Sequence, residues 1–177
     1  MRNVLPAAWG QLGAGYHLLG ELDAALESSE KAVQMQRDTG LPFFLSLHHF
    51  VLGGIHLDLG NWQEARLHAE EALTLARTNH ERHVEGRALI LLGRVMGKTE
   101  PSHTDTAEEH ILQGMKMLDE LKMKPLYATG YVALGELYAG AGQREKAREN
   151  LAKAETLFEE MGMDYWLGET RKVLGGL

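Results

Sequence analysis

Residues 131–142 read YVALGELYAGAG, and the Leu-Gly pair within this stretch recurs along the whole chain. The five pairs are Leu12-Gly13, Leu52-Gly53, Leu92-Gly93, Leu134-Gly135 and Leu174-Gly175. Successive pairs are 40, 40, 42 and 40 residues apart. A period of this length is typical of solenoids, propellers and other repeat arrays.

Further small residues recur at fixed distances from these pairs. A second glycine follows the first by seven residues in three repeats, and because glycine takes a positive φ at little cost, we expect it to end a helix. Two alanine columns follow, seven residues apart, so they lie on one face of the next helix. The pattern predicts one helix pair per repeat. The columns contain Gly20, Gly60 and Gly142; Ala25, Ala65 and Ala147; and Ala32, Ala72 and Ala154.

The expected fold is all-α, in a single domain covering residues 1–177. The first helices of the pairs are predicted at about 5–19, 43–59, 82–97 and 126–140, and the second helices at about 22–38, 62–78, 105–122 and 144–161. The repeats then cover about 5–40, 43–80, 82–123 and 126–162, with a C-terminal cap at 164–177. Capping or first-turn residues are expected to restart the second helices, among them Asp105 with Glu108 after a longer polar connection containing Pro101.

These columns resemble the tetratricopeptide repeat (TPR) over nearly the whole chain. The resemblance implies a right-handed superhelix of about four helix pairs plus a capping helix. The period exceeds the family's usual length of about 34 residues. It is similar to the long repeats at the C-terminus of bacterial multidomain signalling ATPases, cyclase-linked regulators and LuxR-type activators. The matching residues are Trp9, Leu12, Gly13, Tyr16, Gly20, Ala25 and Ala32 in repeat one, and Tyr131, Leu134, Gly135, Tyr138, Gly142, Ala147, Leu151 and Ala154 in repeat four.

Composition narrows the classes of partner. The chain has 177 residues, no cysteine and a formal net charge of −7. The missing cysteines exclude a disulfide scaffold and a thiolate zinc site. The negative charge argues against nucleic acid or an anionic membrane as the main partner. No window of the sequence is long and apolar enough to span a bilayer, and we expect a cytoplasmic protein.

The motifs that carry chemistry are incomplete. The segment GRVMGKT, residues 93–99, is one residue short of a phosphate-binding loop and follows a predicted helix rather than a strand. Nine histidines are present, but the His-Glu-x-x-His motif is not. His49 and His56 occupy the packing columns that hold Trp9 and Tyr16 in repeat one, so we expect them in the core. The sequence predicts no enzyme, no cofactor and no metal.

The resemblance to TPR proteins also implies a ligand groove lined by the first helix of each pair. Repeat one places the small residues Ala7, Gly10 and Ala14 there, so the groove is expected to be open at one end, apolar in the middle and then to carry two arginines. Such a groove suits an extended or helical peptide with an apolar anchor and an acidic neighbour. The residues expected to contact the ligand are His17, Leu47, Phe50, Leu57, Arg87, Ile90, Arg94, Val132 and Glu136.

One known mode of TPR recognition is disfavoured. Chaperone-tail binders grip a terminal carboxylate with Lys, Asn and Lys or Arg, but Gly10, Ala14 and Val51 occupy the corresponding places and only Arg87 fits. The leading hypothesis is a protein- or peptide-binding scaffold, the sensor or interaction module of a larger bacterial signalling or regulatory protein. Two alternatives stay open: a sensor that binds a small-molecule effector, and a homodimerisation module that uses exposed terminal repeats.

Overall fold

The computed structural model describes residues 4–40, 42–99 and 103–177, and the regular structure in these ranges is helical. The all-α repeat architecture is thereby confirmed, and every helix boundary lies within two residues of its predicted position. The helices are α1 (Val4–Leu18), α2 (Leu22–Thr39), α3 (Leu45–Asp58), α4 (Trp62–Thr78), α5 (Arg82–Thr99), α6 (Thr104–Glu120), α7 (Lys124–Gly140), α8 (Arg144–Glu160) and α9 (Asp164–Gly175).

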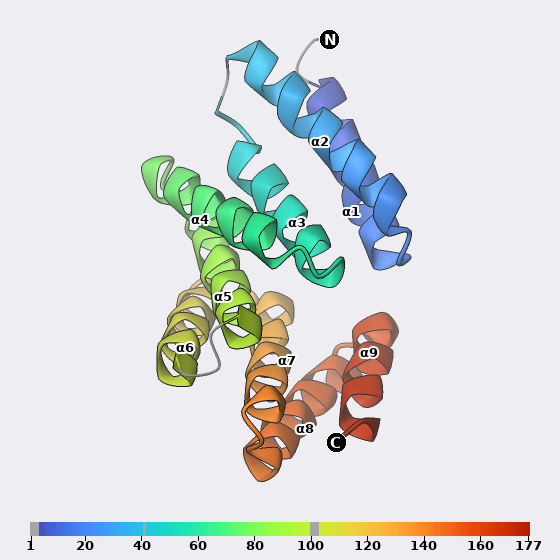
Figure 1. Ribbon diagram of the computed structural model, residues 1–177, viewed down its shortest axis with the longest axis vertical. Coiled ribbons are helices and arrows are strands. Elements are labelled where there is room, and N and C mark those ends of the chain that lie inside the picture. The colour runs from blue at the N-terminus through green and yellow to red at the C-terminus, as the bar shows by residue number, and fades with distance from the viewer. Residues whose placement is uncertain (1–3, 41, 100–102) are drawn as a thin grey trace. The chain divides into compact units, whose positions relative to one another are not determined.

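The chain divides into two compact units, residues 1–88 and 89–177, and α5 contributes to both. In the first unit α1 packs against α2, α3 packs against α4, and α3 also contacts α1 and α2. In the second unit α7 packs against α6 and α8, and α9 packs on α8. Figure 1 shows α1 with α2, and α7 with α8, as antiparallel pairs. Each unit is thus built from helix pairs whose partners are adjacent in the sequence.

The small-residue columns allow the helices of a pair to approach closely. All six alanines of the two predicted columns are fully buried. At Gly93 on α5, an added Cβ would lie 2.6 Å from the carbonyl oxygen of Ala107 on α6. Real Cβ atoms do not approach a backbone oxygen this closely, so a larger residue would push α6 away from α5. Gly93, the glycine of a Leu-Gly pair, therefore allows α5 and α6 to pack closely.

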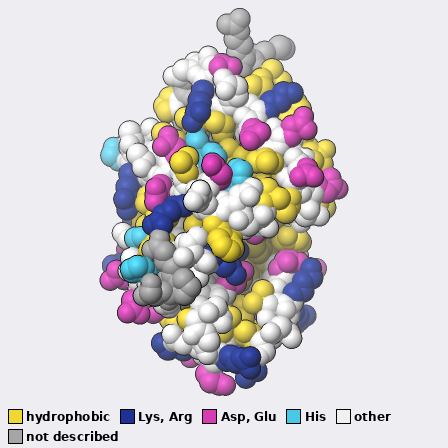
Figure 2. All heavy atoms as spheres, in the orientation of Figure 1, with side chains coloured by type: hydrophobic (Ala, Val, Ile, Leu, Met, Phe, Trp, Pro, Cys, Tyr) yellow, Lys and Arg dark blue, Asp and Glu magenta, His cyan; other side chains and the backbone are white. Residues whose placement is uncertain are grey.

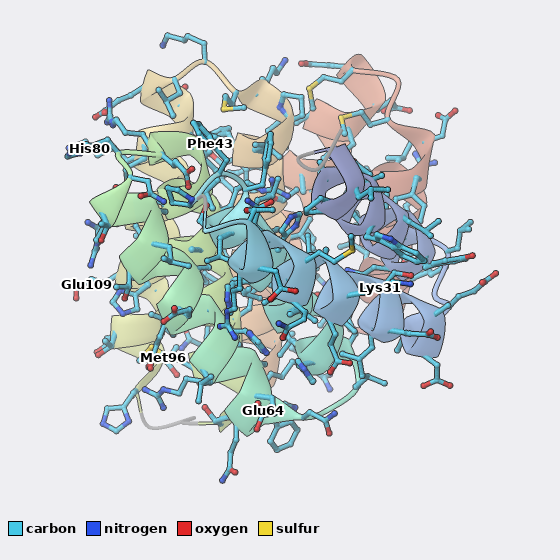
Figure 3. All side chains as sticks on the ribbon, turned by 90° about the horizontal axis from the view of Figure 1, so that it is seen from above. Lys31, Phe43, Glu64, His80, Met96 and Glu109 are labelled. Carbon is cyan, nitrogen blue, oxygen red and sulfur yellow. The ribbon has the colours of Figure 1, made fainter. Side chains whose placement is uncertain are left out.

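The turns between helices use the left-handed backbone region. The three predicted helix-ending glycines have φ values of 76° (Gly20), 75° (Gly60) and 73° (Gly142). The turns that join one repeat to the next place His80 and Lys122, each with a φ of 58°, in the same region. Figure 3 shows His80 at the periphery. The Lys122 amide donates to Asp119 and the Met123 amide donates to Leu118, which is the hydrogen-bond pattern of a Schellman turn.

The expectation of capping or first-turn residues is confirmed for the first turns of α2, α4, α6 and α8, which contain Asp23, Glu64, Asp105 and Glu145, and is wrong for the N-caps. Glu21, Asn61 and Gln143 precede α2, α4 and α8, but none of their side chains accepts a capping hydrogen bond. Asp105 lies inside the first turn of α6 rather than at its N-cap, which is His103. Acidic side chains in first turns still interact favourably with the helix dipole. Pro101 lies outside the described residues.

Helices α9 and α1 differ in how far their apolar side chains are covered. In the second unit, Trp166 of α9 stacks on the fully buried Phe158 of α8, with ring centroids 6.1 Å apart. In the first unit, Leu12 on α1 is 42% exposed, whereas Leu52, its equivalent on α3, is only 2% exposed. Leu52 is covered because α3 packs on α1, α2 and α4. An apolar face of α1 therefore remains uncovered.

Candidate functional site

A cavity of about 190 Å³ lies between α1 and α3 in the first unit. The small residues of α1 that were predicted to line an open end of the groove form one wall. Apolar residues at the start and in the middle of α3 form the other wall, and a single charged side chain, Arg87 of α5, completes the lining. We call this cavity the Arg87 pocket; it is lined by Ala7, Gly10, Gln11, Ala14, Phe44, Leu47, His48, Val51 and Arg87.

The guanidinium group of Arg87 lies over the ring of Phe50, 4.2 Å from its centroid. This is a cation–π contact, which is worth about 0.5–2 kcal/mol depending on how far the cation is desolvated. Burial lowers the pKa of Arg87 to about 10, so the group stays protonated at neutral pH. Leu47, Phe50 and Arg87, three of the predicted ligand-contacting residues, are therefore brought together at one place.

His48 is the second polar side chain in the wall that is buried. Its ring packs so closely against Gly10 that a Cβ on Gly10 would overlap it. Burial lowers the pKa of His48 to about 4, so the imidazole is neutral at pH 7. Its Nε2 atom is buried and has no hydrogen-bond partner in the structure. His48 was not among the residues predicted to contact a ligand, because the repeat pattern placed only its neighbour His49 in a packing column.

The other predicted groove residues of the first unit have local partners. The Nε2 atom of His17 lies 2.7 Å from Asp58 Oδ2, which ties α1 to the end of α3. Leu57 is buried in the core. Neither residue lines the Arg87 pocket.

In the second unit, the predicted groove residues are joined by an ion pair. Arg94 of α5 donates from Nε to Glu136 Oε2 at 2.9 Å and from Nη2 to Glu136 Oε1 at 3.4 Å. The bidentate geometry is that of a strong arginine–carboxylate pair. Ile90 is buried, and Val132 packs against the core cluster formed by α7, α8 and α9. Arg94 thus already has a carboxylate partner, in contrast to Arg87.

A cluster of imidazole rings lies between α3 and α4. The Nδ1 atoms of His49 and His68 are 2.9 Å apart, and the ring of His56 stacks on that of His68 at 5.3 Å between centroids. Arg37 Nη2 donates to His49 Nε2 at 3.3 Å, which requires the proton of a neutral His49 to sit on Nδ1. Burial and the neighbouring His68 and Arg37 lower the pKa of His49 to about 4. The predicted core positions of His49 and His56 are confirmed.

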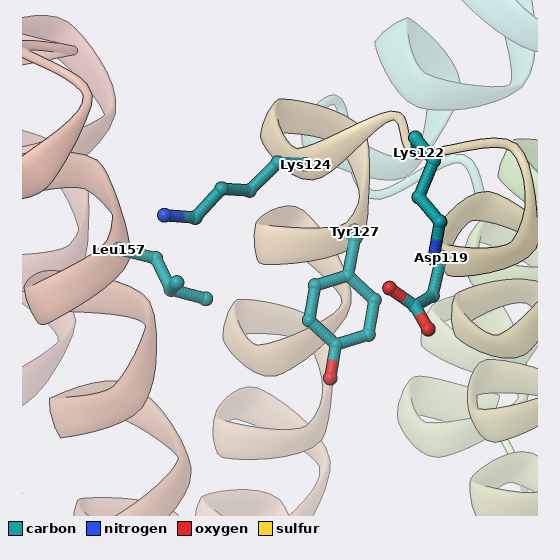
Figure 4. Close-up of a pocket in the computed structure, with 5 residues that line it drawn as sticks. All are labelled: Asp119, Lys122, Lys124, Tyr127 and Leu157. Atoms are coloured by element: carbon teal, nitrogen blue, oxygen red, sulfur yellow. The ribbon is translucent and has the colours of Figure 1, made fainter.

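A second cavity, of about 380 Å³, was not predicted. It lies in the second unit beside the turn between α6 and α7, and Leu157 of α8 forms part of its lining (Figure 4). Lys124 is engaged by Glu160 of α8 at 2.8 Å. The lining residues belong to turns and helix ends, where the repeat columns carry no signal; they are Asp119, Lys122, Lys124, Tyr127 and Leu157.

Surface charge, metal-binding side chains and helix hydropathy concern the other possible partners, namely charged polymers, metal ions and membranes. On the face shown in Figure 2, basic and acidic side chains are interspersed. Among the described residues, no three His, Asp or Glu side chains are arranged to hold a metal ion. The same described ranges contain no helix with the length and hydropathy needed to cross a membrane.

Helix pairs with this spacing and packing define a helical repeat protein of the TPR type. The MalT-like TPR region is the family whose pattern matches, over residues 6–174. The chain belongs to that family. No curated protein matches the sequence.

Solved structures share the fold at low sequence identity. Aspartyl phosphate phosphatase F from Bacillus subtilis is similar with a TM-score of 0.72 and 16% identity over 98% of this chain and 45% of that one. BtubC from P. vanneervenii is similar with a TM-score of 0.68 and 19% identity, over 92% of this chain and 66% of BtubC. The apo form of RapI is similar with a TM-score of 0.67 and 17% identity, over 96% of this chain and 61% of RapI. This chain therefore spans less than two thirds of each of these proteins.

Proposed function

We propose that this chain is a protein- or peptide-binding scaffold, and that it serves as the sensor or interaction module of a larger cytoplasmic regulatory protein in bacteria. The observation that carries the proposal is the Arg87 pocket. It combines an apolar wall with a single guanidinium on helices of a repeat fold. We assign the chain no catalytic role, since helix packing accounts for the residues that recur in each repeat.

The volume of the Arg87 pocket favours a partner's side chain over a metabolite. Small-molecule sites occupy about 300–1,000 Å³, whereas this pocket measures about 190 Å³. A peptide can place one or two side chains in it while the rest of its length lies along α1 and α3. The alternative of a small-molecule effector rests on the larger cavity beside Lys122, at about 380 Å³.

The proposal is tested by selecting a random 12-residue peptide display library on the immobilised chain. Peptides should be enriched, and filling the pocket by Ala14→Phe should weaken their binding at least tenfold, or about 1.4 kcal/mol. The matched control is Ala8→Phe, which adds the same side chain to an exposed position of α1 outside the pocket. The proposal fails if no peptide is enriched, or if the two variants bind equally well while both retain the circular dichroism of the parent protein.

A second candidate function is self-association through α1. Leu5 and Leu12 lie seven residues apart on this helix, Leu19 follows in the turn after it, and all three are exposed. Residues seven apart share one helix face, and exposed apolar stripes mark association sites.

If this stripe pairs two copies, light scattering at high protein concentration should give about twice the 19.7 kDa mass of the chain. Leu12→Lys should return the mass to that of a monomer, because it places a charge in the centre of the stripe. Leu112→Lys is the control, since Leu112 is similarly exposed on α6. A monomeric parent protein at all concentrations rules out this second function.

A further inference from the structure

The electrostatics of the Arg87 pocket identify the class of side chain that it binds. Arg87 has no ion-pair partner among the residues that the structure describes. The acidic residues that precede it on α5 and its N-terminal turn are engaged elsewhere: Glu81 accepts a hydrogen bond from Ser46, and Glu85 pairs with Arg77 at 2.9 Å. Among the described residues, the ring of Phe50 is the aromatic group over which the guanidinium lies.

A desolvated cation without a counter-ion is costly for the free protein. Removing a charge from water is repaid only when an opposite charge and hydrogen bonds replace the lost hydration. The ring of Phe50 covers one face of the guanidinium. The N–H groups of Arg87 lie in the plane of the guanidinium, so the ring cannot accept hydrogen bonds from them. A carboxylate placed at these N–H groups would neutralise the charge and form charge-assisted hydrogen bonds.

The remaining wall supports the same ligand. His48 is 4% exposed, and its ring closes the wall against Gly10 of α1. The apolar residues Leu47 and Val51 and the alanines of α1 provide a surface for methylene groups. Arg87 is the one Lys or Arg among the described residues that line the pocket, which suits a single carboxylate better than a phosphate or several carboxylates.

We infer that the Arg87 pocket binds the carboxylate of a single Asp or Glu side chain from a partner peptide, with Arg87 as the ion-pairing residue and Leu47 and Val51 in contact with the neighbouring apolar atoms. The inference rests on the proposed peptide-binding function and adds the chemistry of the ligand. The ligand is a side chain within a peptide rather than a free carboxylate, because the apolar walls can also bury the neighbouring apolar atoms of the peptide.

The test uses fluorescein-labelled synthetic copies of the peptides enriched on the full chain, each with every Asp or Glu changed in turn to Asn or Gln. For one acidic position, the amide is expected to weaken binding to the parent protein at least tenfold. With Arg87→Gln the same exchange should change the dissociation constant less than twofold. The control is Arg94→Gln, which removes an arginine of the same helix that is already paired with Glu136 and should preserve the preference.

The possible outcomes separate this inference from the proposed function. If peptides bind but the acid and amide forms bind equally, the carboxylate site is wrong while the peptide-binding function stands. A preference that persists in Arg87→Gln assigns the carboxylate to another residue and also overturns the inference. If free N-acetylglutamate amide displaces the peptides as effectively as an unlabelled peptide does, the ligand is a small carboxylate. If no peptide is enriched, the proposed function fails, and this inference fails with it.

Arg87→Gln also has a folding readout that guards against a trivial loss of binding. The substitution removes both an unpaired charge and the cation–π contact with Phe50, so its free energy of unfolding in urea should stay within about 2 kcal/mol of that of the parent protein. Loss of the cooperative unfolding transition would mean that the variant is unfolded, and the acid–amide comparison would then be made with Arg87→Lys, which keeps the charge but cannot form the bidentate pair.

Discussion

Lowering the pH from 7.5 to 5 is expected to destabilise the protein by about 2 kcal/mol for each of His48 and His49. Their folded-state pKa values lie at about 4, against 6.5 for an ordinary histidine. As the pH falls below 6.5, these two histidines become protonated in the unfolded chain but stay neutral in the folded chain. Stability is therefore complete above pH 6.5 and is lost as the pH falls towards 4, to a total of about 3 kcal/mol per group.

The cause lies in the surroundings of the two rings. Both side chains are almost completely buried, and His49 additionally faces His68 and the guanidinium of Arg37. Protonating His49 would remove the acceptor that Arg37 uses and would place two cations side by side. The pKa of His68 is also lowered, by burial and by His56, although Glu64 acts in the opposite direction.

Urea unfolding monitored by circular dichroism at pH 7.5, 6.5, 5.5 and 5.0 measures this dependence. His49→Asn should reduce the slope of stability against pH by about 1.4 kcal/mol per pH unit within the titration window, since one fewer proton is taken up on unfolding. His83→Asn, which removes an exposed imidazole from α5, is the matched control. Equal slopes for the parent protein and His49→Asn would show that the imidazole cluster does not govern acid stability.

Phe158→Ala is expected to destabilise the second unit by about 3–5 kcal/mol. Phe158 is fully buried in a cluster with Ala128, Ala154 and Leu167, and Trp166 stacks on its ring. Alanine would leave a cavity that α9 alone cannot close, because α9 is held in place chiefly by its packing on α8. A loss of this size is a large fraction of the stability of a typical domain, about 5–15 kcal/mol.

Hydrogen exchange of the backbone amides is the sharper measurement for this variant, since the helices of a repeat array can open locally. Exchange should accelerate most in α8 and α9. Leu112→Ala, at an exposed leucine of α6, should cost less than about 0.5 kcal/mol and leave the protection of α9 intact. Unchanged protection of α9 in Phe158→Ala would mean that the cap does not depend on the Phe158–Trp166 stack.

The helices were predictable because their determinants are local and periodic. The Leu-Gly pairs mark the middle of α1, α3, α5 and α7, and the three predicted positive-φ glycines mark the ends of α1, α3 and α7. His80 and Lys122 show the limit of this signal. They adopt the same left-handed conformation without being glycine, because the hydrogen bonds of the turn and the packing of the flanking helices impose it.

The groove residues were predictable only as positions on helices. Arg87 and Arg94 lie seven residues apart on α5 and are equivalent by sequence, so both were expected to meet a ligand. Arg94 is instead bound by Glu136, which is 42 residues away in the chain, whereas Arg87 rests on Phe50 without a carboxylate. Ionic partners separated by this distance in sequence are chosen by the packing of the repeats, and the spacing of residues within one helix carries no information about them.

The sequence by itself determined the repeat, the helix boundaries and the membership of the core, because each follows from the preferences of short segments and from periodic burial. Only the tertiary structure decided which polar side chains are neutralised, which histidines contact one another and where a cavity remains. These properties depend on distances between helices, and a difference of one or two ångströms there separates an arginine paired with a carboxylate from one without such a partner.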